Sequence, residues 1–104
     1  MNRGELLKNI GSILGKVYGT RLRGVVLYGS EARGESEPDS DIDVLVLLEG
    51  PIRLWDDIQT ITAALYPLQL DLDRTLSAIP ADADEYEKGS RSLYRHAQRE
   101  GIRV

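Results

Sequence analysis

The chain has 104 residues, of which 41% are hydrophobic and 29% are charged, values typical of a globular protein and unlike those of a disordered one. Its net charge of -4 excludes a protein that mainly coats phosphate backbones, because such binding requires clustered Lys and Arg. It has no cysteine, which excludes disulfides and thiolate metal sites, and no apolar run near the roughly 18 residues of a membrane span. We therefore expect one cytoplasmic domain spanning residues 1–104, with neither membrane association nor direct nucleic-acid binding.

The first half of the chain shows one helical and two strand patterns. Apolar residues recur at helical spacing between Arg3 and Tyr18, and Gly19 is a typical helix end. Residues 23–28 are short, β-branched and apolar, which predicts a buried strand that a Gly-Ser turn ends. After a polar loop or short helical turn, residues 41–48 (DIDVLVLL) form the strongest strand pattern in the sequence.

The second half begins with another helical stripe, from Leu54 to the Tyr66-Pro67 pair, where proline predicts its end. Trp55 is expected at the core edge of this helix. Strict alternation in LQLDLD, residues 68–73, predicts a strand with one polar face. The charged tail is helical in pieces. This order predicts an α+β fold, or α/β two-layer fold, in which a small mixed sheet has helices packed on one side.

Two aspartates stand where the strongest strand begins. Residues two apart on a strand point to the same face, so Asp41 and Asp43 lie side by side at a backbone spacing of about 6 to 7 Å. Unpaired, the two carboxylates repel each other and raise each other's pKa. A hard divalent cation such as Mg²⁺ resolves the repulsion, because it prefers oxygen ligands and is often bound by one or two carboxylates plus substrate phosphates.

The polar face of LQLDLD offers a third carboxylate, from either Asp71 or Asp73. Asp71 lies between leucines at the centre of the predicted strand, whereas Asp73 is near its end, so we expect Asp71 to be the ligand. Three carboxylates are able to hold two ions about 3.5 to 4 Å apart, the arrangement used for in-line displacement at phosphorus.

The Gly-Ser turn provides groups that bind phosphate. Gly29 allows the backbone to approach a ligand closely, and the Ser30 hydroxyl and the following amides are donors to phosphate oxygens. Arg33 adds a positively charged fork suited to the same oxygens. We therefore predict a phosphate-binding set of Gly29, Ser30 and Arg33 facing the carboxylates.

A Gly-Ser pair followed after ten residues by Asp-x-Asp resembles the signature of the DNA polymerase β-like nucleotidyltransferase superfamily. LYGSEARGE and SDIDVLV are similar to the minimal nucleotidyltransferases of bacteria and archaea. The resemblance implies the nucleotidyltransferase fold, triphosphate binding by Gly29 and Ser30, metal binding by Asp41 and Asp43, and the third acidic role for Asp71. LDLD offers two acids on one face, so Asp73 competes for that role.

The resemblance also implies a function: Mg²⁺-dependent transfer of a nucleoside monophosphate, AMP from ATP, to a hydroxyl acceptor. Minimal members often form a toxin-antitoxin pair with a helical HEPN-domain protein, some by transferring AMP to a toxin tyrosine. The main alternative is a non-catalytic subunit that neutralises a helical partner, and a small-molecule acceptor such as an aminoglycoside is a further one. A partner or a second copy is expected to complete the site, and the sequence leaves the base, the acceptor and the oligomeric state open.

Overall fold

A four-stranded mixed sheet organises the chain in the computed structural model, which describes residues 2–35, 37 and 39–104. The strand order is β3-β2-β1-β4. β1 (Leu22–Tyr28) runs antiparallel to β2 (Ile42–Leu48) and to β4 (Ile102–Arg103), whereas β3 (Leu76–Asp82) runs parallel to β2. The predicted α+β fold with a mixed sheet is confirmed.

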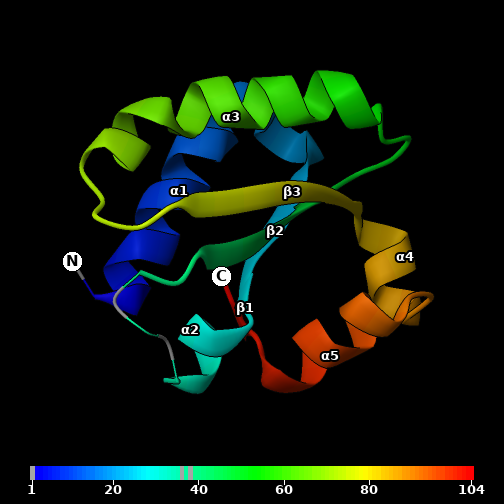
Figure 1. The fold of residues 1–104 in the computed structure, drawn as a ribbon. Helices are drawn as coiled ribbons and strands as arrows, with labels where there is room; N and C mark the ends of the chain where they lie inside the picture. The colour runs from blue at the N-terminus through cyan, green and yellow to red at the C-terminus, as the bar shows by residue number, and fades with distance from the viewer. Residues whose placement is uncertain (1, 36, 38) are drawn as a thin grey trace.

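The two long helices, α1 (Arg3–Tyr18) and α3 (Leu54–Leu70), lie on the same face of the sheet (Figure 1). They bury one side of β1 and β2 in a common core, in which alternate strand residues such as Val44 and Val46 are fully buried. Gly19 ends α1 with a φ of 58°, as its position predicts. No helix within the described parts of the chain has the length and hydrophobicity that a bilayer crossing requires.

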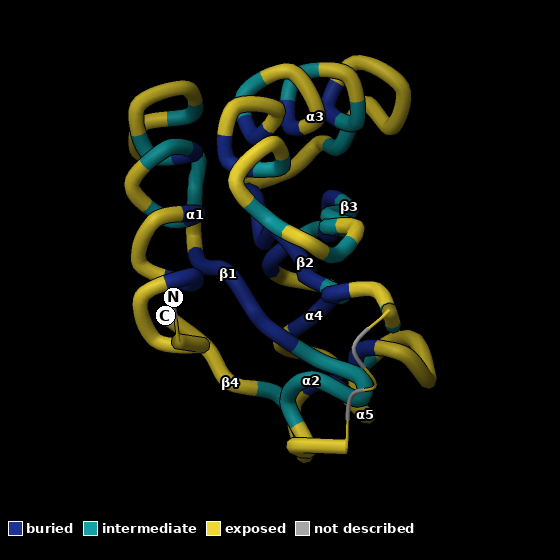
Figure 2. Tube along the Cα trace, turned by 60° about the vertical axis from the view of Figure 1, so that its left-hand side comes forward, coloured by how far each residue is buried: buried dark blue, intermediate teal, exposed yellow. Residues whose placement is uncertain are grey.

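Two short helices cover the opposite face of the sheet, where the sequence patterns placed none. α4 (Ala83–Lys88) and α5 (Ser92–Glu100) pack on Leu45 and Leu47, which alternate with the residues that face α1 and α3. The central strands are therefore buried on both sides, as the dark tube of β1 and β2 shows (Figure 2). This explains why residues 44–48 are continuously apolar.

The strand predicted for residues 68–73 is wrong, because α3 continues through Pro67 to Leu70 and the chain then turns. Leu68 follows Leu65 at helical spacing and joins it in the core, so these leucines fit a helix as well as an alternating strand. Gln69 then bonds the next strand, accepting from the Leu76 backbone N–H at 2.7 Å. The strand beside β2 is β3, which begins only at Leu76.

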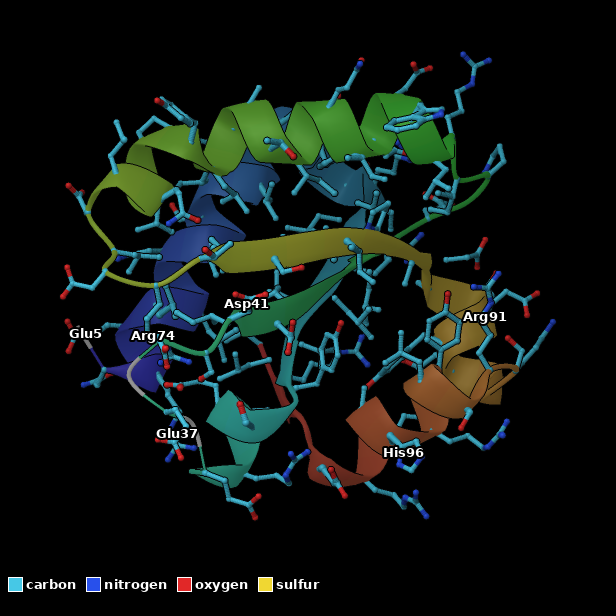
Figure 3. The ribbon with its side chains drawn as sticks, in the orientation of Figure 1. Glu5, Glu37, Asp41, Arg74, Arg91 and His96 are labelled. Carbon is cyan, nitrogen blue, oxygen red and sulfur yellow. The ribbon has the colours of Figure 1, made fainter. Side chains whose placement is uncertain are left out.

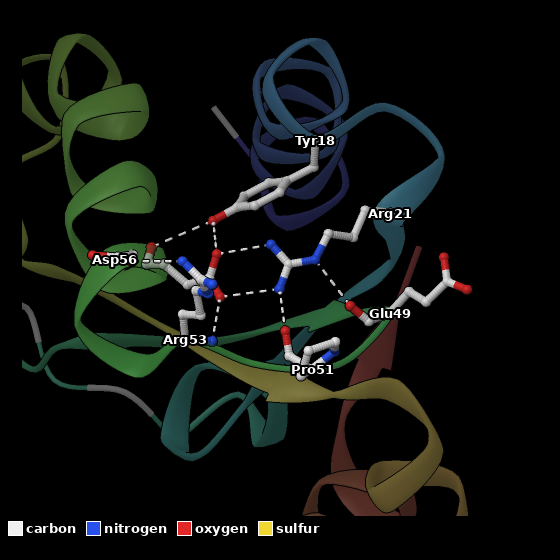
Figure 4. A network of polar contacts seen from close by, with 7 residues as sticks. Tyr18, Arg21, Glu49, Pro51, Arg53 and Asp56 are labelled. Carbon is white, nitrogen blue, oxygen red and sulfur yellow. Dashed lines mark hydrogen bonds and ion pairs between the residues drawn. The ribbon is translucent and has the colours of Figure 1, made fainter.

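A buried carboxylate ties the far end of β2 to both long helices. Asp57 is 4% exposed and accepts hydrogen bonds from the Arg21 guanidinium at 3.0 and 3.1 Å and from the Tyr18 hydroxyl at 2.9 Å. Arg21 also donates to the backbone oxygens of Glu49 and Pro51, just after β2 (Figure 4). This network lies at the opposite end of β2 from the two predicted metal-binding aspartates.

Asp57→Asn is expected to lower the free energy of unfolding at pH 7 by about 3 kcal/mol, because it leaves Arg21 without its buried charge partner. Burial alone would raise the pKa of Asp57, but the hydrogen bonds from Arg21, Arg53 and Tyr18 lower it below its ordinary value. A lowered pKa contributes stability that is present at neutral pH and is lost as the pH falls below about 4. Urea denaturation of both proteins at pH 7 and pH 3 should show the difference shrinking, and a constant difference would contradict this account.

Candidate functional site

The two halves of the sequence motif meet at one end of the sheet. β1 ends at Tyr28, Gly29 turns the chain with a φ of 74°, and the short helix α2 (Ser30–Arg33) follows. β2 begins directly after Asp41, and its residue Asp43 pairs with Tyr28 across the sheet. Asp41 is seen at this end of β2, on the side where α2 lies (Figure 3).

The backbone of Gly29 lies directly against the Asp43 carboxylate. A Cβ atom at Gly29 would stand 2.8 Å from Asp43 Oδ2, closer than real Cβ atoms approach an oxygen, and the backbone there has a conformation that other residues avoid. Both facts require glycine at this position. The bend that was predicted to bind phosphate is thus brought next to one of the two predicted metal ligands.

Gly29→Ala is expected to lower the free energy of unfolding by about 1–3 kcal/mol through backbone strain and to displace Asp43 as well. Gly34→Ala is the matched control, since Gly34 also has a φ of 74° but no atom within 4 Å of the added Cβ. Urea denaturation measures the first effect, and titration with Mn²⁺ measures the second. Only Gly29→Ala should weaken Mn²⁺ binding. Equal Mn²⁺ affinities in the two variants would show that the added Cβ at position 29 does not displace the Asp43 carboxylate.

Asp41 and Asp43 form a pair of carboxylates that no cationic side chain among the described residues neutralises. Asp41 is exposed and Asp43 is half-buried, and no ion pair within the described residues involves either side chain. Burial first, and then the charge of Asp41, raise the pKa of Asp43. Burial and the charge of Asp43 likewise raise the pKa of Tyr28 beside it. Two uncompensated carboxylates at a glycine bend fit a divalent cation carried with phosphate oxygens.

The other predicted phosphate-binding groups lie on α2. Ser30 is the first residue of this helix, so its amide has no partner in a preceding helical turn, whereas the Arg33 amide donates to the Gly29 carbonyl oxygen at 3.3 Å. Arg33, at the end of α2, is exposed and forms ion pairs with Glu35 at 3.3 Å and with Glu100 of α5 at 3.2 Å. Arg33 would have to leave these carboxylates in order to bind a phosphate.

The structure places Asp71 off the sheet that carries Asp43. Asp71 and Asp73 lie in the turn after α3 and line a hollow beside Arg74 and Glu31. Across residues 2–35, 37 and 39–104, no three acidic, histidine or cysteine side chains are arranged to hold a metal ion. The three-carboxylate cluster is therefore not seen among these residues, since residues 68–73 end a helix and turn instead of forming a strand, and the role of Asp71 stays a prediction.

β3 places a serine where the third carboxylate was expected. Ser77 is the register partner of Asp43 on the neighbouring parallel strand, so the two side chains lie on the same face of the sheet. The next residues of β3 on that face are Ile79 and Ala81. Thus β3 supplies no acid beside Asp43, and sequence reasoning missed this because it assigned the wrong segment to the strand.

A known protein family and several solved structures are similar to this chain. The family profile described as a nucleotidyltransferase domain matches residues 7–97. A solved structure described as a minimal nucleotidyltransferase shares 27% identity with this chain, covers 98% of it and 95% of its own length, and has a TM-score of 0.58. No curated protein sequence showed significant similarity to the chain.

Two toxin-antitoxin structures are also similar in fold. A variant of the MntA-HpeT toxin-antitoxin matches 100% of this chain and 72% of that chain at 17% identity, with a TM-score of 0.61. A toxin-antitoxin solved with AMP-PNP matches 92% of this chain and 70% of that chain at 23% identity, with a TM-score of 0.55. At these identities the likeness establishes the fold.

Proposed function

This chain belongs to the nucleotidyltransferase domain family, and on that premise we propose that it transfers AMP from ATP to a hydroxyl group. The observation that carries the proposal is the contact between the Gly29 bend and Asp43, whose carboxylate has no cationic partner within the described residues. A cation there would neutralise the aspartates and bring phosphate oxygens to the bend in one step. The similar toxin-antitoxin solved with AMP-PNP supports an adenine nucleotide as the substrate.

The residues have separate tasks in this proposal. Asp41 and Asp43 would hold Mg²⁺, which when bound neutralises phosphate charge and polarises the reacting phosphoryl group. The Gly29 bend and the Ser30 hydroxyl and amide orient the triphosphate tail by hydrogen bonds. The chain thus acts mainly by positioning and by charge stabilisation, which supply most of the catalysis in phosphoryl transfer.

The reaction itself is a displacement at the α-phosphorus of ATP. An acceptor oxygen forms a bond to the α-phosphorus, the bond from that phosphorus to the oxygen it shares with the β-phosphorus breaks so that pyrophosphate leaves, and the acceptor's proton passes to solvent water. β3 has no carboxylate beside Asp43 to take this proton. A loose transition state demands little help with proton removal, so two carboxylates are sufficient for slow transfer.

The acceptor in this proposal is a hydroxyl group on a helical partner protein of the HEPN type, with this chain as the antitoxin. The outer surface of α3 supports such a partner. Trp55 is 75% exposed rather than at the core edge, and it shares this surface with Leu54, Tyr66 and Leu70, all more than half exposed. Residues 58–70 contain no charged side chain, although they face solvent in part. Exposed apolar surface of this extent is typical of a protein interface.

Transfer can be tested with ATP labelled at the α-phosphate. The chain is mixed with the protein encoded beside it and with Mg²⁺, and the intact mass of both proteins is then measured. We expect a mass increase of one AMP on the partner and none when EDTA is present. The proposal would be rejected if the partner gained no mass although this chain had been shown to bind the nucleotide.

A second candidate is a binding subunit that neutralises its partner without catalysis. Ser77 favours it, because this residue stands where a third carboxylate could have bound the metal or activated the acceptor. The same mass measurement separates the two functions. Formation of a stable complex without any mass increase supports binding alone.

A further inference from the structure

Arg74 connects the two halves of the candidate nucleotide site. Its guanidinium donates to the Glu31 carboxylate at 2.6 Å, and Glu31 directly follows the Gly-Ser pair in α2. The same guanidinium donates to the Ser40 carbonyl oxygen at 2.8 Å and to the Ser40 hydroxyl at 3.3 Å. It also contacts the carbonyl oxygen of Asp41 at 3.5 Å. Arg74 and Asp41 are labelled at this end of the sheet in Figure 3.

The connection is well shielded and firmly anchored. The side chains of Arg74 and Glu31 are only 18% and 16% exposed, so their charge-assisted bond is weakly screened by water. Gln69 at the end of α3 donates to the Arg74 carbonyl oxygen at 2.9 Å. One residue later, the Thr75 carbonyl oxygen accepts from the Ile42 N–H at 2.8 Å, where the pairing of β2 with β3 begins.

The chain itself does little to hold these halves together. Within the described residues between Arg33 and Ile42 there is no further helix or strand. Arg3 holds α2 against α1 by donating to the carbonyl oxygens of Glu31 and Ala32, each at 3.2 Å. The Arg74 bridge differs because it joins α2 directly to the segment that enters β2, in addition to the pairing of β1 with β2. Nothing in the local sequence pattern around Arg74 indicates this role.

We infer that Arg74 is a positioning residue that sets the Gly29–Ser30 bend against the Asp41–Asp43 pair. It acts through Glu31 on the first half and through the Ser40 and Asp41 carbonyl oxygens on the second, without contact to substrate. Groups hydrogen-bonded to metal ligands typically change metal affinity by about 10- to 100-fold when they are replaced, and Arg74, which contacts the Asp41 backbone and not its carboxylate, is expected at the low end of this range. The inference rests on the proposed nucleotide site. It also predicts that the contact with Glu31 supports phosphate binding, whereas the contacts with Ser40 and Asp41 support metal binding.

Arg21 provides a matched control. Like Arg74, it joins a carboxylate, that of Asp57, to two backbone carbonyl oxygens, but it does so at the opposite end of β2. Arg21→Lys and Arg74→Lys each keep the charge and lose the planar fork that bonds several oxygens at once. Both variants should therefore lose thermal stability, whereas only Arg74→Lys should affect the site.

The test measures Mn²⁺ binding by electron paramagnetic resonance, with Mn²⁺ alone and with Mn²⁺ plus AMP-PNP. Arg74→Lys is expected to weaken both affinities about tenfold, and Arg21→Lys to leave both unchanged. Glu31→Gln removes the contact to α2 but keeps those to Ser40 and Asp41. It should weaken binding of the Mn²⁺ and AMP-PNP complex more than binding of Mn²⁺ alone. Wild-type affinities in Arg74→Lys would overturn the inference.

Amide hydrogen exchange of the ligand-free proteins keeps this inference separate from the proposed function. The Ile42 amide, bonded to Thr75, and the Glu35 amide, bonded to Ser30, should exchange at least about tenfold faster in Arg74→Lys than in Arg21→Lys. Unchanged exchange at both amides would refute the positioning role. Failure of the wild-type protein to bind Mn²⁺ with AMP-PNP would instead refute the nucleotide site, while the exchange result still decides the role of Arg74.

Discussion

Asp43→Asn is expected to reduce nucleotidyl transfer at least about a hundredfold, because it removes one of two charges that would hold Mg²⁺ against the Gly29 bend. The measurement is transfer of label from α-labelled ATP. Asp71→Asn and Asp73→Asn are the matched controls, since both residues lie in the turn after α3. Both controls should retain transfer. Loss of activity in Asp71→Asn would show that this residue reaches the site after all.

The same substitution should stabilise the protein in the absence of metal. Burial and the charge of Asp41 raise the pKa of Asp43, so the folded state favours its protonated form. The ionised form present at neutral pH therefore opposes folding, and this cost disappears as the pH falls below the ordinary value. Thermal denaturation at pH 7 should give Asp43→Asn a Tm a few degrees above that of the wild-type protein. In a domain of this size, a change of about 4–8 °C in Tm corresponds to about 1 kcal/mol. At pH 3 the two Tm values should converge, and a lower Tm at pH 7 would contradict the account.

Ser77→Asp is expected to strengthen divalent-cation binding by about tenfold or more, because affinity rises with the number of charged ligands. Ser77 lies beside Asp43 on the same face of the sheet. The carboxylate of the introduced aspartate would therefore complete a cluster of three. Isothermal titration with Mn²⁺ measures the affinity, and the labelled-ATP assay measures any gain in transfer. In metal-free buffer the variant should have a lower Tm, because the added charge repels Asp41 and Asp43.

Ser77→Asn is the control for this gain, since it has nearly the size of aspartate without the charge. It should bind Mn²⁺ as the wild-type protein does. Equal affinities for the aspartate and asparagine variants would mean that β3 does not face the metal site. A gain in affinity without a gain in transfer would favour the binding subunit over the enzyme.

Local patterns alone were sufficient for the parts of the fold that lie close together in sequence. The helix ending at Gly19, the strands on either side of the Gly-Ser turn and the α+β class follow from apolar spacing and turn residues. The contact of Gly29 with Asp43 has the same origin, because an antiparallel pair joined by a polar segment brings the two motif halves to one end of the sheet. The amino-acid sequence therefore determined where the bend and the aspartate pair meet.

Tertiary structure decided the rest, because it depends on which segments pack together. LQLDLD satisfies both the helical and the strand period, and packing of Leu68 beside Leu65 in the core selects the helix. With that choice Asp71 leaves the sheet and Ser77 takes the place beside Asp43. The bridge from Arg74 to Glu31 and Ser40 spans 43 and 34 residues of sequence, a separation at which no local pattern reports contact.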